Sequence, residues 1–142
     1  MTINDNLKPI SIEVVPEDQR LATTEKLFGN HFPLSIEPAI YAFADHLCTD
    51  YRGGYWDFYT LSNGGFYMAP NQQTDFHVIC SNQFEGDLSP SAFGMSVGCY
   101  AFSHLSFSED ESLSQLCAKH YHLLRDAVLD HPDGPQILRA ID

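Results

Sequence analysis

A serine between two glycines is the pattern in this chain that is most suggestive of catalysis. Gly94, Ser96 and Gly98 match the G-x-S-x-G sequence that presents the nucleophile in α/β-hydrolases. Asp126 and His131 follow in the chain order that those enzymes use. The motif requires a strand before the serine and a helix after it, whereas here the serine falls inside a predicted helix. Small residues four positions apart more simply let another helix approach closely, so a small cytoplasmic hydrolase using Ser96 is kept only as an alternative.

Cys117 and His120 are the second candidate pair, because thiolate and imidazole are ligands that zinc prefers. His104, His122 and Cys99 lie nearby in the sequence, but no spacing matches a paired zinc motif such as C-x-x-C. Cys117 and His120 also fall on the apolar stripe of a predicted helix, where a small hydrophobe and a hydrogen-bonded histidine are ordinary occupants. We therefore expect no metal, no cofactor and no catalysis. A metal-dependent enzyme using this pair is the other form of the enzyme alternative.

Aromatic and charged residues in the middle of the chain suggest contacts with a protein partner instead. Strand alternation places Tyr55, Asp57 and Tyr59 on one face of a predicted strand, and aromatic side chains beside a charge are typical interface anchors. The alternative is that helices cover both faces of this strand. Asp142 ends a predicted helix, where the helix dipole disfavours negative charge, so a cationic group on a partner is its expected counterpart. The candidate partner-binding residues are Arg52, Tyr55, Asp57, Tyr59, Asn63 and Asp142.

The charge balance excludes direct nucleic-acid binding. Seven Lys and Arg residues against 19 Asp and Glu residues give a formal net charge of −12, which repels phosphate backbones. DNA mimicry is also disfavoured, since duplex DNA carries a charge about every 1.7 Å and a mimic of about 40 Å would need roughly twenty carboxylates on one face. The carboxylates here are scattered from Asp5 to Asp142. An acidic surface would still speed encounter with a basic protein.

The elements that must position these residues can be read from periodicity and turn signals. β-Branched and aromatic runs predict three strands, and Asn63-Gly64 between the last two aromatic runs predicts a hairpin with a type I′ turn. We expect residues 76–80 to add a further strand in an antiparallel meander. Apolar spacing predicts the helices, with a capping box formed by Ser108 and Glu111. The expected strands are 10–15, 55–61, 66–68 and 76–80, and the expected helices are 17–27, 38–51, 91–105, 108–131 and 135–141.

These elements predict an α+β fold, in which a small antiparallel sheet packs with four or five helices. At 142 residues, 44% of them hydrophobic, the chain forms a single domain over 1–142, with residues 1–8 a flexible N-terminal arm. Four widely spaced cysteines and the lack of a signal sequence or an apolar span indicate reduced thiols in a cytoplasmic protein that does not enter membranes. The oligomeric state is left open, with a monomer favoured.

Several stretches of the sequence resemble one family, that of the ArdB and KlcA antirestriction proteins of plasmids and genomic islands. The resemblance is densest from Leu47 to Pro70 and extends along the whole chain. The residues that carry it are Leu47-Cys48, Asp50-Tyr51, Gly53-Gly54-Tyr55-Trp56, Phe58 to Gly65 and Met68-Ala69-Pro70, together with Val15 to Leu21, Phe32-Pro33-Leu34, Glu37-Pro38, Tyr100 to His104 and Ile141-Asp142.

This resemblance implies a function that composition does not reveal. It implies a small acidic α+β protein that lets incoming plasmid or phage DNA evade type I restriction-modification in a bacterial cytoplasm. It does not imply an enzyme, and it leaves the route of inhibition open. We expect the protein to act through protein contacts, with a type I restriction enzyme or a host factor that controls it as the partner.

Overall fold

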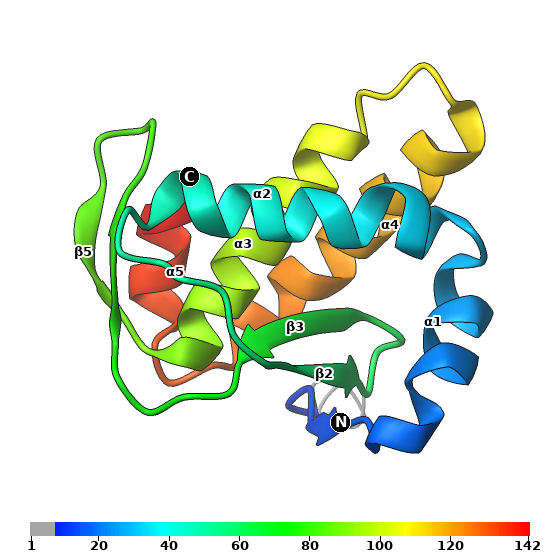
Figure 1. Cartoon of the computed structure of the whole chain (residues 1–142), viewed down its shortest axis with the longest axis horizontal. Coiled ribbons are helices and arrows are strands. Elements are labelled where there is room, and N and C mark those ends of the chain that lie inside the picture. The colour runs from blue at the N-terminus through cyan, green and yellow to red at the C-terminus, as the bar shows by residue number, and fades with distance from the viewer. Residues whose placement is uncertain (1–7) are drawn as a thin grey trace, which may run out of the picture.

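The computed structural model describes residues 8–142 and has the expected α+β architecture, with five α-helices and two small antiparallel sheets within that range (Figure 1). The arm predicted over residues 1–8 lies outside the described residues except for Lys8. Within residues 8–142 no helix has the length and apolar character needed to cross a bilayer.

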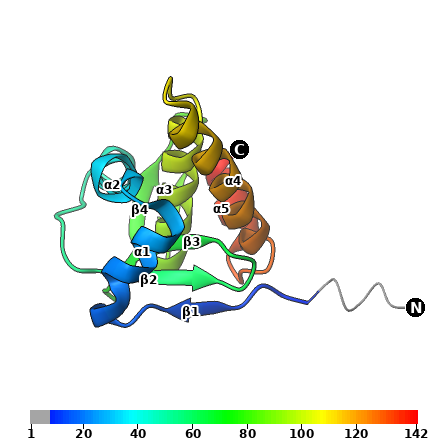
Figure 2. The same cartoon turned by 90° about the vertical axis from the view of Figure 1, so that its right-hand side faces the viewer.

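A three-stranded antiparallel sheet lies at the base of the fold, in the order β1-β2-β3 (Figure 2). Its strands are β1 (Ile12–Val14), β2 (Trp56–Leu61) and β3 (Phe66–Pro70). The predicted hairpin between β2 and β3 is confirmed, with Phe58 opposite Met68 and Tyr59 opposite Tyr67. The sheet therefore brings the N-terminal segment beside the hairpin, so that β1 forms one edge.

The type I′ turn predicted for this hairpin is wrong. Asn63 is not at positive φ, and Gly64, at φ 95°, is the turn residue that adopts the left-handed region. The amide of Gly64 donates to the carbonyl of Leu61, and the amide of Leu61 donates to the carbonyl of Gly65. This is the three-residue hairpin loop, which needs one left-handed residue where type I′ needs two. Asn63 instead accepts the Gly65 amide through its side chain.

The predicted strand at residues 76–80 is present, but it does not extend the meander. β4 (Phe76–Ile79) pairs with β5 (Glu85–Leu88) in a separate two-stranded sheet. β5 was not predicted, because its sequence Glu-Gly-Asp-Leu has little strand propensity. His77 on the neighbouring strand β4 offsets this low strand propensity by contacting both acidic residues of β5. Its Nδ1 lies 2.7 Å from Asp87, and its Nε2 lies 2.9 Å from Glu85.

The first half of the chain supplies two helices with an irregular connection. A short 3₁₀ turn, η2 (Glu17–Gln19), leads into α1 (Arg20–Phe28), and a π-helical segment, η3 (Phe32–Ile36), leads into α2 (Glu37–Leu47). The prediction that the second helix continues to Tyr51 is wrong, since Cys48 is already extended at φ −123° and ψ 104°. The freed Tyr51 hydroxyl accepts the indole N–H of Trp56 at 2.9 Å.

The second half is helical, as predicted, and comprises α3 (Pro90–Leu105), α4 (Glu111–Val128) and α5 (Gly134–Ile141). α3 is the central helix, and its residues from Ala92 to Cys99 are all buried. The capping box predicted at Ser108 is wrong, because Asp110 caps α4 by accepting the amide of Leu113 at 3.2 Å.

Aromatic rings fill the core between the sheet and the first helices. Phe66 on β3 has its ring centroid 5.3 Å from that of Phe28 and 5.6 Å from those of Phe32 and Phe58. Phe102 on α3 lies 6.1 Å from Phe28. Edge-to-face pairs of this kind contribute beyond their buried area, so the cluster ties α1, η3, β2, β3 and α3 together.

Two glycines of α3 give a test of this packing. A Cβ on Gly94 would overlap the backbone carbonyl oxygen of Met68 and lie 2.6 Å from the Cβ of Ala69, whereas a Cβ on Gly98 would meet the flexible end of Leu124 at 2.9 Å. Gly94→Ala should therefore lower the free energy of unfolding by about 3 kcal/mol, measured by urea denaturation. Gly98→Ala, the matched control, should stay within about 1 kcal/mol because alanine also favours helix. Equal effects of the two substitutions would contradict this account of the packing.

Candidate functional site

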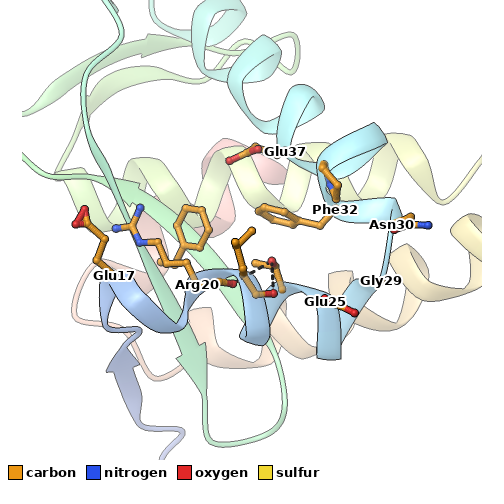
Figure 3. Close-up of a pocket in the computed structure, with 11 residues that line it drawn as sticks. Glu17, Arg20, Glu25, Gly29, Asn30, Phe32 and Glu37 are labelled. Carbon is orange, nitrogen blue, oxygen red and sulfur yellow. Dashed lines mark hydrogen bonds between the residues drawn. The ribbon is translucent and has the colours of Figure 1, made fainter.

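A groove of about 510 Å³ lies between α1, η3 and β2 (Figure 3). Glu17 and Arg20 lie at one end of the groove, and Gly29 and Asn30 lie at the other. Glu37 borders it from the α2 side. We refer to this hollow as the α1–η3 groove.

The floor of the groove is apolar and belongs to the aromatic core. Phe32 and Phe58, which are 4% and 6% exposed, face each other with ring centroids 5.6 Å apart. The stacking of Phe28 on Phe32, at 5.6 Å, holds η3 against α1. Packing that stabilises the fold therefore also sets the shape of the groove.

Arg20 is the cation in the lining of the groove, and it is held by aromatic rings. Its guanidinium carbon lies 4.3 Å from the centroid of Phe58 and 4.8 Å from that of Tyr55. A guanidinium over an aromatic face is stabilised by the ring quadrupole. One terminal nitrogen lies 3.5 Å from Asp57, and Nε is buried without a hydrogen-bond partner. These contacts fix Arg20 at the end of the groove.

The carboxylates of Glu17, Glu25 and Glu37 also line the groove. Glu17 accepts the hydroxyl of Tyr55 at 3.0 Å. Burial and the neighbouring Glu37 carboxylate raise the pKa of Tyr41 to about 12, so this phenol stays neutral at physiological pH. Three carboxylates against one guanidinium leave the lining with an excess of negative charge.

Of the residues predicted to bind a partner, Tyr55 and Asp57 both contact Arg20, which lines the groove, but they do not line it themselves. Tyr55 is 49% exposed. Tyr59 is half-buried and stacks on Tyr67 at 4.8 Å, on the sheet face that Tyr55 and Asp57 share by alternation. Arg52 is exposed in the loop before β2 and donates to the carbonyl of Thr49 at 3.0 Å.

The other two predicted residues lie elsewhere. The Asn63 amide is engaged at both ends, since Oδ1 accepts the Gly65 amide and Nδ2 donates to the carbonyl of Leu123. Asp142 is exposed and pairs with Arg125 at 2.9 Å. Figures 1 and 2 place the C-terminus across the fold from the hairpin. None of the six predicted residues lines the groove; Tyr55 and Asp57 contact its lining residue Arg20, and Tyr59 shares their sheet face.

The groove residues that the sequence prediction missed come from segments already noted for another reason. Arg20 and Leu21 fall in the stretch Val15 to Leu21, and Phe32 and Pro33 open the stretch Phe32 to Leu34, both of which carry the family resemblance. No periodicity links these stretches, since one is a 3₁₀ turn entering a helix and the other is π-helical. The resemblance was therefore the available signal for them.

The hydrolase alternative finds no support at Ser96. This side chain is 1% exposed and donates its hydroxyl hydrogen bond to the carbonyl of Ala92 at 2.8 Å. Back-bonding of this kind is a common way for a serine to be satisfied within a helix. The hydroxyl is closed off from any substrate in this conformation.

A serine–histidine contact does occur, between the Ser91 hydroxyl and Nε2 of His131 at 3.0 Å. The backbone amide of Asp133 donates to Nδ1 of His131 at 2.9 Å, so the neutral ring carries its proton on Nε2. Burial lowers the pKa of His131 and favours that neutral form. Nε2 is then a donor to Ser91, whereas a general base would have to accept the serine proton there. The Tyr67 hydroxyl completes the chain at 3.1 Å from Ser91, which makes it a structural network.

Cys117 and His120 are both buried, and among residues 8–142 no three His, Cys, Asp or Glu side chains are arranged to hold a metal. Burial raises the pKa of the Cys117 thiol to about 11, which disfavours the thiolate that binds metals. His120 packs against the rings of Phe28 and Phe102 at 4.5 and 5.6 Å, and its Nδ1 has no partner. The pair forms part of the core.

Comparisons with known proteins agree along the chain. Residues 49–142 match the family described as "Antirestriction protein". The chain is 34% identical over 142 residues to the antirestriction protein KlcA of Escherichia coli, covering 99% of this chain and 100% of the relative. It is 36% identical to protein YfjX of Escherichia coli K12, covering 94% of this chain and 88% of that one.

A solved structure also matches. It superposes with a TM-score of 0.87 at 35% identity, covering 95% of this chain and 96% of that one. It is described as a structure of the KlcA and ArdB proteins, with a novel fold and antirestriction activity against type I DNA restriction systems in vivo but not in vitro.

The burial of His120 predicts a defined pH dependence of stability. Burial, followed by the charge of Lys119, lowers the pKa of His120 to about 4, against about 6.5 in the unfolded chain. Between these values the unfolded chain binds a proton that the folded chain does not, so the free energy of unfolding falls as pH falls from 6.5 to 4, by about 3 kcal/mol. His120→Leu should remove this component, measured by urea denaturation across that range. An NMR titration placing the His120 pKa near 6.5 would contradict the prediction.

Proposed function

The chain belongs to the antirestriction protein family, and from that membership we propose that it lets incoming DNA escape type I restriction by binding a protein of the host. That partner is a type I restriction enzyme or a factor that controls it. The site of action is the bacterial cytoplasm, where restriction meets incoming DNA. The protein acts without catalysis and without direct contact with nucleic acid.

The observation that carries this proposal is the match to KlcA and ArdB over 95% of the chain with a TM-score of 0.87. Activity in vivo but not in vitro, as described for those proteins, favours a mechanism that needs a further cellular component. A binding protein that recruits or blocks such a component fits that behaviour. The net charge of −12 supports a protein partner over a nucleic acid, because it repels phosphates and attracts basic surfaces.

The surroundings of the side chains that could support catalysis favour a binding role over an enzymatic one. Ser96 is sealed within α3, and His131 presents a proton to Ser91 where a base would present a lone pair. Cys117 and His120 are core residues. The residues proposed to contact the partner are Arg52, Tyr55, Asp57, Tyr59, Asn63 and Asp142, of which Tyr55 and Asp57 lie next to Arg20.

The first test is the plating efficiency of unmodified phage on a strain with a type I restriction system, with and without this protein. Plating efficiency should rise by an order of magnitude or more when the protein is expressed, because restriction is relieved. A matched strain that lacks the system should show no rise. Ser96→Ala should protect as well as the parent chain, since it removes one hydrogen bond within a helix. Failure of a soluble, folded protein to protect would contradict the proposal, and loss of protection in Ser96→Ala would favour the hydrolase alternative.

Removal of Asp142 tests the contact proposed at the C-terminus. The Arg125–Asp142 pair is exposed, so its loss should cost less than about 1 kcal/mol of stability, and thermal melting should change little. Protection in the plating assay should fall if Asp142 meets a cationic group of the partner. Asp126→Asn, at an exposed carboxylate on α4, is the control and should protect normally. Full protection by the chain that lacks Asp142 would remove this residue from the contact.

A further inference from the structure

We propose that the α1–η3 groove docks a short basic and amphipathic segment of the partner protein. An apolar side chain of that segment packs on Phe32 and Phe58, and its lysine or arginine side chains face Glu17, Glu25 and Glu37. The inference rests on the proposed function, which requires a protein partner, and adds to it the surface and the chemistry of the segment bound there.

Exposed leucines beside the groove are the first observation behind this inference. Leu21 on α1, which lines the groove, is 85% exposed, and Leu34, which follows the lining residue Pro33, is 76% exposed. Phe32 and Phe58 supply a buried apolar floor next to them. Large apolar side chains left in solvent beside a preformed hollow are typical of interaction sites. The volume of about 510 Å³ suits a few side chains of a segment.

The charge of the groove lining indicates which class of ligand binds there. Three carboxylates line the groove, and its cation, Arg20, is already placed over two rings and beside Asp57. A segment carrying positive charge is attracted, whereas a nucleic acid or a second copy of this chain, each strongly negative, is repelled. Small apolar molecules would use the floor and leave the carboxylates unused. The lining therefore fits a basic peptide segment best.

The backbone around the groove gives independent support. η3 is π-helical and starts three residues after Gly29, whose φ is 59°. π-Helical turns are rare and occur often at functional sites. Here the turn places Pro33 and Leu34 at the surface while Phe32 and Ile36 stay buried. The groove is thus preformed, which lowers the entropic cost of binding a segment.

The edge strand β1 presents a second exposed apolar surface. Ile12 and Val14 on the edge strand β1 are 41% and 53% exposed. They share a sheet face with the half-buried Tyr59, by register. Asp57 is the charged residue on this face of β2, and it is already engaged by Arg20. The groove combines apolar floor, charge and shape in one place, so the inference is confined to it.

Two pairs of matched variants test the groove in cells. Leu21→Gln should reduce protection in the plating assay at least tenfold, whereas Phe107→Gln, at an equally exposed position outside the groove, should protect normally. The double substitution Glu25→Lys with Glu37→Lys should abolish protection. Glu109→Lys with Asp126→Lys, which changes the net charge by the same amount at exposed sites elsewhere, should not. Melting temperatures must show that all four variants fold.

A purified system tests the chemistry directly, with a synthetic amphipathic peptide of leucine and lysine as the probe. NMR shifts of backbone amides should be confined to groove residues such as Arg20, Phe32 and Phe58, and binding should saturate. The Glu25→Lys/Glu37→Lys variant should bind the probe about tenfold more weakly, and the Glu109→Lys/Asp126→Lys variant should bind as the parent does. A peptide with glutamate in place of lysine should not bind.

The outcomes separate this inference from the function on which it rests. Protection by the parent chain together with full protection by Leu21→Gln, or probe binding that is equal in the two charge-reversed variants, would overturn the groove proposal and leave the proposed function standing. Self-association through the groove, measured by light scattering and lost in Leu21→Gln, would replace the partner segment with a second copy. Failure of the parent chain to protect would count against the proposed function, while the probe would still test the groove.

Discussion

The close approach of α3 to β3 is the constraint on which the rest of the structure depends. No side chain fits between the helix and the strand at Gly94, because a Cβ there would overlap the Met68 carbonyl. β3 on the other side of this contact is the last strand of its sheet, and β4 pairs with β5 in a second sheet. The contact also fixes α3 as the central element, against which α4, α5 and α2 all pack. Gly94 of the G-x-S-x-G sequence therefore has a packing explanation, whereas Gly98 meets only the flexible end of Leu124. Ser96 between them lies on the same central helix and is buried.

The aromatic cluster connects the packing of α3 and β3 with the shape of the α1–η3 groove. Phe66 is held on β3, and Phe28, Phe32 and Phe58 pack around it. The stacking of Phe28 on Phe32 then holds α1 against η3, and Phe58 lines the hollow that remains. The groove is a consequence of how the core packs, so its shape does not depend on a mobile loop. Substitutions at these rings would change both the stability of the fold and the shape of the groove. Substitutions at exposed positions change the groove without changing stability.

Local chemistry made much of the fold predictable. Asn63-Gly64 between aromatic runs specified the hairpin, and Pro38, Pro90 and Pro135 lie near the starts of their helices, as expected for proline at a first turn. β5 could not be predicted, because Glu85 and Asp87 are held in a strand by their contacts with His77 on the neighbouring strand. The turn type was missed because the Asn63 side chain bonds to Gly65 and Leu123, and the second of these partners is 60 residues away. The groove could not be predicted from the sequence either, because the residues that line it come from stretches that share no hydrophobic periodicity.

The small size of the docked segment determines how long the complex lasts. Such a contact buries less than the roughly 1,200 Å² that marks stable complexes, so it is transient and its lifetime is short. Electrostatic attraction then contributes mainly through the rate of encounter, and a net charge of −12 favours rapid association with a basic partner at low ionic strength. Under the proposed function, a weak, charge-steered contact of this kind depends on a partner that the cell supplies, which agrees with the activity in vivo but not in vitro described for KlcA and ArdB.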